Sequence, residues 1–276
     1  MTHKYERQIK RLISRLRTGS DNFILIHHDY SKGTSLNVKT ASDLHILDNY
    51  IPVKLGDLSV ARAKLEGMLW LIREKINFDW LIHISGQDYP IKPLRQIEKS
   101  LMGAVCDAFI HFERIHENPQ YHRRPFQTLC LHRYFYRRVK LFGLKIFQFK
   151  RRHPYKKGFH CYAGSDWFNL SRTAVEYFWL KKNLTNRLLH YLRRTSTPAE
   201  TLFQTILLNA AHFKIHNTDK RFIIWRADAS HPEILTSEYY DEIKMSDAWF
   251  ARKFDTTLYP EILDKIDDLI QSGRCR

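Results

Sequence analysis

Glu200 is the carboxylate that the sequence places best for acid–base chemistry. It lies near the start of "STPAETLFQTILLNAAHF" (residues 196–213), which has the apolar spacing of a helix with Thr197 as N-cap, Pro198 as N1 and Glu200 as N3. A carboxylate at the mouth of a helix can take a proton from a bound hydroxyl as a general base. The other interpretation is a capping-box glutamate that accepts a hydrogen bond from the amide of Thr197, and the two roles are compatible.

Three cationic side chains in the last quarter of the chain could hold an anion. Arg221 precedes the apolar run "FIIW", and Arg252 and Lys253 lie between aromatic residues in "WFARKFD" (residues 249–255). Most Arg and Lys side chains are solvated surface charges. Two cations flanked by aromatic residues also suit a partly buried anion site.

Asp166 and Trp167 could together bind a sugar. They follow Gly164 and Ser165, a pair that favours a turn, so the aspartate is predicted to be a turn or cap residue and the tryptophan a core residue. Alternatively, the aspartate binds sugar hydroxyls while the indole packs against a pyranose ring.

Several well-known catalytic and binding motifs are missing from the sequence. There is no G-x-G-x-x-G, P-loop, D-x-D, H-E-x-x-H or G-x-S-x-G pattern. We therefore expect no bound metal and no cofactor, and cationic side chains would have to neutralise any diphosphate. Cysteines occur without C-x-x-C spacing at Cys106, Cys130, Cys161 and Cys275, which favours reduced thiols in a cytoplasmic protein.

The elements that must position these residues follow an α/β pattern. Helical spacing covers residues 5–16 and Ser59–Ile76, and apolar strands are predicted in "NFILIHHD" (residues 22–29) and "FDWLIHIS" (residues 78–85). Strand, helix and strand in this order are typical of a parallel sheet, in which ligands bind beyond the carboxyl ends of the strands. The residues predicted at that edge are His28, Asp29, Gln87 and Asp88.

The rest of the chain continues this α/β pattern without a linker, so we predict a single domain over residues 1–276. Further strands are expected at residues 107–112 and, as the last one, 221–225; residues 164–171 lead into a helix over Thr173–Lys182. Two capped helices are expected at residues 236–244 and 259–270.

The chain is strongly basic, with a formal charge of +16 and a pI near 9.7. Much of this charge lies in residues 121–157, which hold twelve Lys or Arg and nine Phe or Tyr, inside an insertion of about residues 118–160. We interpret this basic segment as a solvated insertion that covers an acceptor cleft, or as a surface for anionic membrane; nucleic-acid binding is the least favoured interpretation. The N-terminus lacks the apolar core of a signal peptide, and no apolar run is long enough to span a membrane.

Five motifs in register resemble one family of glycosyltransferases over nearly the whole chain. They are "FILIHHD", "FDWLIHISGQDYPIKP", "GSDWFNLSR", "TPAETLFQT" and "WFARKFD". The family is the core-2/I-branching enzymes, glycosyltransferase family 14, which includes β-1,6-N-acetylglucosaminyltransferases and peptide O-xylosyltransferases. The resemblance implies a GT-A type, Rossmann-like nucleotide-sugar fold with a mostly parallel central sheet, inversion at the anomeric carbon and no metal.

The resemblance also assigns roles to individual residues. Glu200 matches the catalytic base, and Arg221 and Lys253 match the cations that neutralise the donor diphosphate, next to Arg252. The nucleotide and sugar of the donor are expected near His28, Asp29, Gln87 and Asp88, and Asp88 is predicted to serve hydrogen bonding and architecture rather than metal ligation. The residues that match acceptor-binding positions are Asp166, Trp167, Glu113 and Arg124.

The sequence departs from the family pattern at its start. Family members begin with an apolar strand, whereas this chain opens directly at "MTHKYERQIKRL". Either the true start lies upstream of Met1 or the sheet lacks its first strand, which would leave a nucleotide-side edge exposed. The membrane anchor and disulfides of secretory-pathway members are also absent, so we expect a bacterial-type cytoplasmic enzyme that can associate peripherally with the inner membrane face.

The predicted function is therefore an inverting, metal-independent transfer of a sugar from a UDP-sugar to a hydroxyl of a glycan, lipid-linked or polysaccharide acceptor. The expected donor sugar is N-acetylglucosamine or xylose. The alternative is a non-catalytic protein on a degenerate transferase fold that binds an anionic glycan or a membrane surface.

Overall fold

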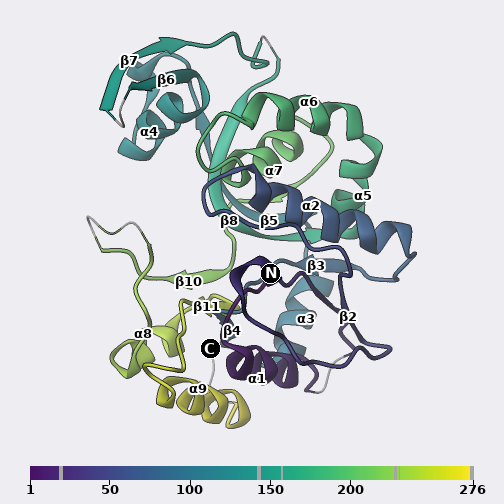
Figure 1. Ribbon diagram of the computed structural model, residues 1–276. Coiled ribbons are helices and arrows are strands. Elements are labelled where there is room, and N and C mark those ends of the chain that lie inside the picture. The colour runs from purple at the N-terminus through teal and green to yellow at the C-terminus, as the bar shows by residue number, and fades with distance from the viewer. Residues whose placement is uncertain (19–20, 142–143, 157, 227–228, 230, 274–276) are drawn as a thin grey trace. The chain divides into compact units, whose positions relative to one another are not determined.

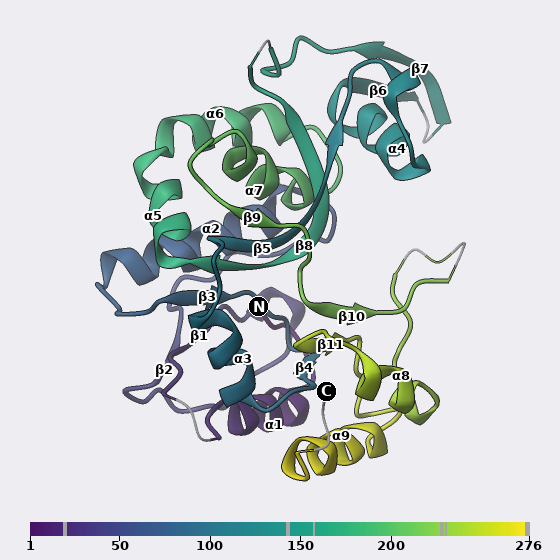
Figure 2. The same ribbon diagram turned by 180° about the vertical axis from the view of Figure 1, so that it is seen from behind.

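The computed structural model describes residues 1–18, 21–141, 144–156, 158–226, 229 and 231–273, and Figures 1 and 2 show it from opposite sides. The chain forms two compact units, each assembled from segments that are separate in the sequence. The first unit comprises Met1–Pro52, Ile82–Val105 and Asp219–Arg276, and the second comprises Val53–Leu81 and Cys106–Thr218. Cys275 lies outside the described residues, and the basic segment is described except at residues 142–143 and 157.

Among the residues that the structure describes, the first unit contains two small sheets and four α-helices. Its strands are β1 (Ile24–Ile26), β2 (Leu44–Ile46), β4 (Asp88–Pro90), β10 (Arg221–Ile223) and β11 (Phe250–Arg252). Its helices are α1 (Glu6–Leu16), α3 (Leu94–Met102), α8 (Tyr240–Met245) and α9 (Glu261–Gln271), with short 3-10 turns at Tyr30–Lys32 and Ser237–Tyr239. β1 pairs with β2 in parallel, and β11 lies between its parallel partner β10 and its antiparallel partner β4.

Apolar residues at helical spacing explain why α1 packs where it does. Leu12 joins a buried cluster with Tyr89 of β4 and Ile266 of α9, while Ile9 and Ile13 join a second cluster around β1 and β2. The helix therefore links both sheets of the first unit, as its amphipathic sequence predicts.

The first two residues of the chain pair with backbone groups next to β1. Thr2 donates its amide to the carbonyl of His27 at 2.8 Å and accepts a hydrogen bond from the amide of Asp29 at 2.9 Å. Met1 accepts one from the amide of Gly86 at 3.0 Å. Thr2 thus forms a parallel bridge with His28, just beyond β1. The two alternatives for the start of the chain stay predictions.

The second unit is built on a four-stranded sheet in the order β3-β8-β5-β9, with a separate hairpin of β6 and β7. The strands are β3 (Trp80–Ile82), β5 (Ala108–Ile115), β6 (Tyr136–Leu141), β7 (Leu144–Lys150), β8 (Cys161–Ser171) and β9 (Ile215–His216). The helices are α2 (Leu58–Arg73), α4 (Pro125–Tyr134), α5 (Arg172–Leu180), α6 (Lys182–Leu192) and α7 (Ala199–Leu208), with a 3-10 turn at Pro119–Tyr121. Figure 1 shows α2, α5, α6 and α7 gathered beside β5 and β8.

Aromatic side chains hold α7 against β8. Phe203 of α7 lies 4.8 Å from Phe168 of β8 and 5.5 Å from Phe178 of α5, measured between ring centroids. A glycine permits the close approach of β8 to β5, because a Cβ atom at Gly164 would lie 1.9 Å from the carbonyl oxygen of His111, where the register shifts. Gly164 is therefore a strand residue, and the turn predicted before Asp166 is wrong.

The α/β class is confirmed, and the helices predicted at residues 5–16, Ser59–Ile76 and 259–270 correspond to α1, α2 and α9. The sheets are mixed rather than mostly parallel: β5 pairs with β8 in the antiparallel sense and with β9 in the parallel sense. The strand at residues 221–225 is not the last, since β11 follows it. The GT-A class and the single domain stay predictions.

Candidate functional site

Glu200 lies in the first turn of α7, behind a tight turn at Thr197. Thr197 has a left-handed backbone with φ of 50°, and its amide donates to the carbonyl of Gly56 at 2.7 Å. That amide is therefore not available to the side chain of Glu200, and the predicted capping box is wrong. Instead, Glu200 Oε2 accepts a hydrogen bond from Nη1 of Arg133 at 3.2 Å, while 28% of the side chain stays exposed.

Helix α4 of the basic segment holds this turn in place. Nη1 of Arg133 also donates to the hydroxyl of Thr197 at 3.2 Å, and the Tyr134 hydroxyl donates to the Thr197 carbonyl at 3.1 Å. Cys130 and Tyr134 are fully buried. α4 therefore buries one face within the unit, and the interpretation of the basic segment as a solvated insertion stays a prediction. The sequence offered no signal for Arg133, because it is one of twelve cations in that segment.

The surroundings of Glu200 favour its protonated form. Burial raises the pKa of Glu200 and Asp166 adds to that effect, while Arg133, the Thr197 hydroxyl and Lys64 act in the opposite direction. A carboxylate whose pKa is raised toward neutral is a stronger proton acceptor when ionised, which is the property that a general base needs.

Asp166 is paired with a buried lysine that sequence reasoning missed. Nζ of Lys64, on α2, lies 2.7 Å from Oδ1 of Asp166 and also donates to the Asp166 backbone carbonyl. Only 1% of the Lys64 side chain is exposed, against 22% of Asp166. The available signal was a charged residue on the apolar face of a predicted helix, between Ala61 and Met68. Trp167, which follows Asp166 in β8, is half-buried.

Glu113 and Arg124 are brought together at 3.3 Å, as their joint assignment to an acceptor region requires. Glu113, on β5, is 13% exposed at its side chain, and Arg124, at the start of α4, is 69% exposed. Their contact with an acceptor stays a prediction.

In the first unit, Asp88 lies between two guanidinium groups. Its Oδ1 is 3.6 Å from Nε of Arg252 and 3.9 Å from Nε of Arg221, and its side chain has no exposed surface. The other carboxylate oxygen accepts hydrogen bonds from the amide and the hydroxyl of Ser85. Adjacent strands β4, β11 and β10 thus supply one anion and two cations.

Arg221 is fixed by main-chain carbonyls as well as by Asp88. It donates to the carbonyl of His83 at 2.7 Å and to that of Asp219 at 2.9 Å, and its guanidinium carbon lies 4.8 Å from the ring centroid of Phe250. Burial lowers the pKa of Arg221 to about 10, which leaves the side chain protonated at neutral pH.

Lys253 lies next to this cluster and is more accessible. Burial lowers its pKa, the cations Lys4 and Arg252 add to that effect, and Asp255 opposes it. The local set of Lys4, Arg221, Arg252 and Lys253 faces Asp88, Asp219 and Asp255. A cluster of cations of this kind favours an anionic ligand.

The residues predicted to line the nucleotide make internal contacts. Nδ1 of His28 hydrogen-bonds the Thr2 hydroxyl at 2.8 Å and Nε2 lies 3.1 Å from the Thr34 carbonyl, so both ring nitrogens have partners. Asp29 accepts from the amide of Ser31 at 3.0 Å. Gln87 donates to the carbonyl of Phe254 at 3.3 Å. These contacts fix the loops beyond the strands, and the contact of the three side chains with a nucleotide stays a prediction.

Neither a metal cluster nor a membrane-spanning helix occurs in the part of the chain that the structure describes. No group of three or more His, Cys, Asp or Glu side chains there could hold a metal ion. No helix among those residues is both long and apolar enough to cross a bilayer. Cys106, Cys130 and Cys161 are free cysteines.

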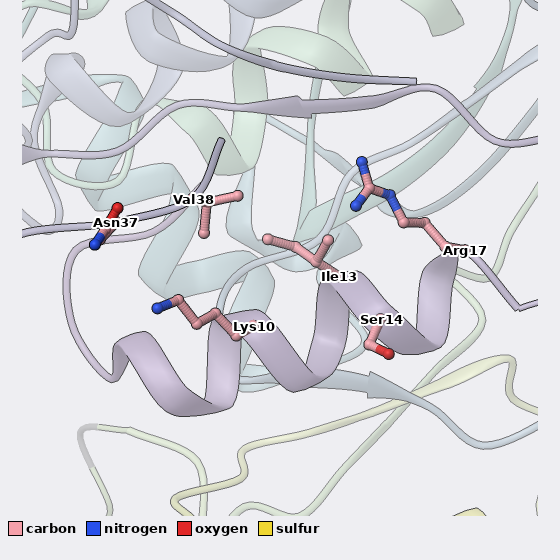
Figure 3. Close-up of a pocket in the computed structure, with 6 residues that line it drawn as sticks. All are labelled: Lys10, Ile13, Ser14, Arg17, Asn37 and Val38. Atoms are coloured by element: carbon pink, nitrogen blue, oxygen red, sulfur yellow. The ribbon is translucent and has the colours of Figure 1, made fainter. Parts of the chain in front are cut away.

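A pocket of about 300 Å³ lies in the first unit beside α1, away from the candidate residues. Figure 3 shows Ile13 of α1 and Val38 of the following loop pointing toward each other across it. The cations at its rim already have partners: Lys10 pairs with Glu6 at 2.9 Å, and Arg17 pairs with Asp43 at 2.6 Å. The pocket therefore adds nothing to the candidate site.

Comparison with known proteins gives consistent results. The family model for the Core-2/I-Branching enzyme matches residues 1–247. The chain is 29% identical to the β-glucuronosyltransferase GlcAT14A of Arabidopsis thaliana over 247 residues, which is 87% of this chain and 53% of the relative. It is 30% identical to GlcAT14B of the same plant, over 71% of this chain and 45% of the relative. It is also 26% identical to the xylosyltransferase oxt of Drosophila pseudoobscura pseudoobscura, over 77% of this chain and 26% of the relative. The chain thus spans about half the length of the first two relatives.

Proposed function

Because the chain belongs to the core-2/I-branching enzyme family, we propose that it is a glycosyltransferase that moves a sugar from a UDP-sugar to a hydroxyl group of a glycan acceptor. The observation that carries this proposal is the setting of Glu200. Its carboxylate is at the opening of α7, held by Arg133, partly exposed, and raised in pKa by burial.

The proposed chemistry is a single displacement with inversion. Glu200 takes the proton of the acceptor hydroxyl, and the oxygen attacks the anomeric carbon of the donor from the face opposite UDP. The bond between the anomeric carbon and the diphosphate oxygen breaks, and UDP leaves with the electron pair. The products are the glycosylated acceptor and UDP, with the proton left on Glu200.

Cations of the first unit are proposed to stabilise the leaving diphosphate in place of a metal. Lys253 is the half-buried cation that is accessible for a direct contact, whereas Arg221 and Arg252 supply positive charge from buried positions beside Asp88. Fixed charges in such a setting can stabilise a departing anion without reorganising during the reaction. His28, Asp29 and Gln87 would shape the loops that receive the nucleotide.

The donor sugar is proposed from the names of the relatives. N-acetylglucosamine and xylose are the sequence-based predictions, and one relative is named as a xylosyltransferase. Three other relatives are named as β-glucuronosyltransferases, so UDP-glucuronic acid joins the candidate donors. The alternative of a non-catalytic glycan-binding protein is not favoured, because the matched family is named as an enzyme family and the relatives are named as transferases.

UDP release from UDP-glucuronic acid, UDP-xylose and UDP-N-acetylglucosamine tests this proposal directly. We expect one donor to give turnover, and Glu200→Gln to lower it by about 10²- to 10⁴-fold while UDP still binds. Full activity of that variant would remove Glu200 from the mechanism, and absence of turnover with a bound donor would favour the non-catalytic alternative. Turnover that EDTA abolishes and Mn²⁺ restores would contradict the metal-free reaction.

A further inference from the structure

Lys64 stands out because it is a charged side chain with almost no exposed surface, on a helix that none of the sequence motifs includes. Its ammonium group lies 5.3 Å from the ring centroid of Phe168, 5.8 Å from that of Phe203 and 5.9 Å from that of Trp167. Removing an ammonium ion from water is costly unless it is paired, and here Asp166 is the partner.

The Lys64 ammonium binds Asp166 at two points. It contacts the carboxylate at 2.7 Å and also donates to the backbone carbonyl of the same residue. These two contacts fix both the side chain and the main chain of β8 at Asp166. If this pair served stability alone, apolar residues could replace it at little cost in folding free energy. Its position in the fold is therefore evidence about a role in function.

Helix α7 connects this pair to Glu200. Gln204, one turn after Glu200 and on the same face of α7, donates to the carbonyl of Ser165 at 2.6 Å, directly before Asp166. Phe203, whose ring faces the Lys64 ammonium, also belongs to α7, and α2 packs against α7. The start of α7 is thus attached to the segment of β8 that Lys64 holds.

We propose that Lys64 is a positioning residue for the reaction. Its ammonium group holds Asp166 in place, and it thereby determines the position of the negative charge that the catalytic carboxylate of Glu200 faces. This inference rests on the proposed function. It assigns Asp166 a second role, as the anion that Lys64 holds and whose charge acts on Glu200, in addition to the predicted contact with an acceptor.

The charged and titratable groups around Glu200 come from three elements. Arg133, Cys130 and Tyr134 face it from α4, Asp166 from β8 and Lys64 from α2. Burial raises the pKa of Glu200 most, Asp166 raises it further, and Lys64 lowers it. Removal of Lys64 should therefore raise the pKa of Glu200, and removal of the Asp166 charge should lower it.

The first test does not require a substrate. The stability difference between a protein and its Glu200→Gln variant, measured as Tm from pH 4 to 8, changes between the unfolded-state pKa and the folded-state pKa of Glu200, so the midpoint of this change moves with the folded-state pKa. We expect this midpoint to move up in Lys64→Met and down in Asp166→Asn, each by on the order of half a pH unit. The double variant should return close to the original midpoint, and Arg62→Met, at an exposed position of the same helix, should leave it unchanged.

The second test uses turnover of the donor identified by UDP release. Lys64→Met should lower kcat by about ten- to a hundredfold with little change in the KM for the donor, and Lys64→Arg should recover part of the loss. Midpoints that stay in place or move in the same direction in Lys64→Met and Asp166→Asn would overturn the inference, as would unchanged kcat in Lys64→Met. A fully active Glu200→Gln would instead overturn the proposed function, so the two failures are distinguishable.

Discussion

Glu200 and Asp88 are both carboxylates beside arginine side chains, yet their surroundings suit opposite tasks. Asp88 lies within 4 Å of two guanidinium groups and accepts two hydrogen bonds from Ser85, with no surface exposed. Glu200 has one arginine partner and keeps 28% of its side chain exposed. A carboxylate that must exchange a proton with a substrate needs access and a pKa near neutral, whereas a counter-ion needs neither. The difference separates a candidate base from a structural anion.

Of the substitutions that test this difference, one at Asp88 is expected to have the largest effect, on the free energy of unfolding. Asp88→Asn leaves two buried guanidinium groups without their carboxylate, and removal of one partner from a buried ion pair costs about 3–5 kcal/mol. We expect that loss in the free energy of unfolding, measured by urea denaturation. Glu200→Gln should show no comparable loss, because the amide oxygen still accepts from Arg133. Equal stability of Asp88→Asn and the unmodified protein would refute the counter-ion role.

The next largest effect is expected on UDP binding, and it distinguishes the role of the cations in the first unit from that of the base in the second. Lys253→Met should weaken UDP binding by about ten- to a hundredfold, the range expected for loss of one charge-assisted contact. Isothermal titration with UDP at two salt concentrations would measure it, and the affinity of the variant should depend less on salt than that of the unmodified protein. Lys244→Met, at another lysine of the same unit that lies in α8, is the matched control. Unchanged affinity in Lys253→Met would exclude a diphosphate contact.

The comparison also shows how far sequence could lead. Local signals were sufficient for the long helices: apolar spacing located α1 and α2, and Glu200 was placed in the first turn of α7. Contacts between distant segments left no such signal. Lys64 and Asp166 are 102 positions apart, and Arg133 and Glu200 are 67 apart. Charge pairs of this kind depend on which strands and helices become neighbours, which residue spacing does not encode.

Strand β4 was also missed by the sequence analysis. Asp88 was expected beyond the end of the strand at residues 78–85 rather than inside a strand, because aspartate and proline are typical of turns. In the structure β4 is an edge strand beside β11, where proline is tolerated because the outer side of the strand needs no amide donor. Pairing of β4 with β11, which places Asp88 opposite Arg252, therefore overrides the preference of aspartate and proline for turns.

A smaller effect concerns stability and pH at Glu200. Burial raises the pKa of Glu200 above its ordinary value of 4.5, so the folded state binds the proton more tightly than the unfolded state. The contribution of Glu200 to stability is therefore fully present below pH 4.5 and is lost as the pH rises through the folded pKa. We expect Glu200→Gln to have a higher Tm than the unmodified protein at pH 7 and a similar Tm at pH 4. A lower Tm of the variant at pH 7 would contradict the raised pKa.

The smallest effect is expected at another carboxylate–arginine contact, the one between Glu113 and Arg124. Because 69% of the Arg124 side chain is exposed, Arg124→Ala should change the free energy of unfolding by less than about 1 kcal/mol. If Arg124 contacts the acceptor, the same variant should raise the KM for the acceptor and leave UDP binding unchanged. Unfolding and acceptor titrations with Arg123→Ala as a neighbouring control would separate the two. A loss of stability as large as that of Asp88→Asn would mean that exposure does not separate these carboxylates.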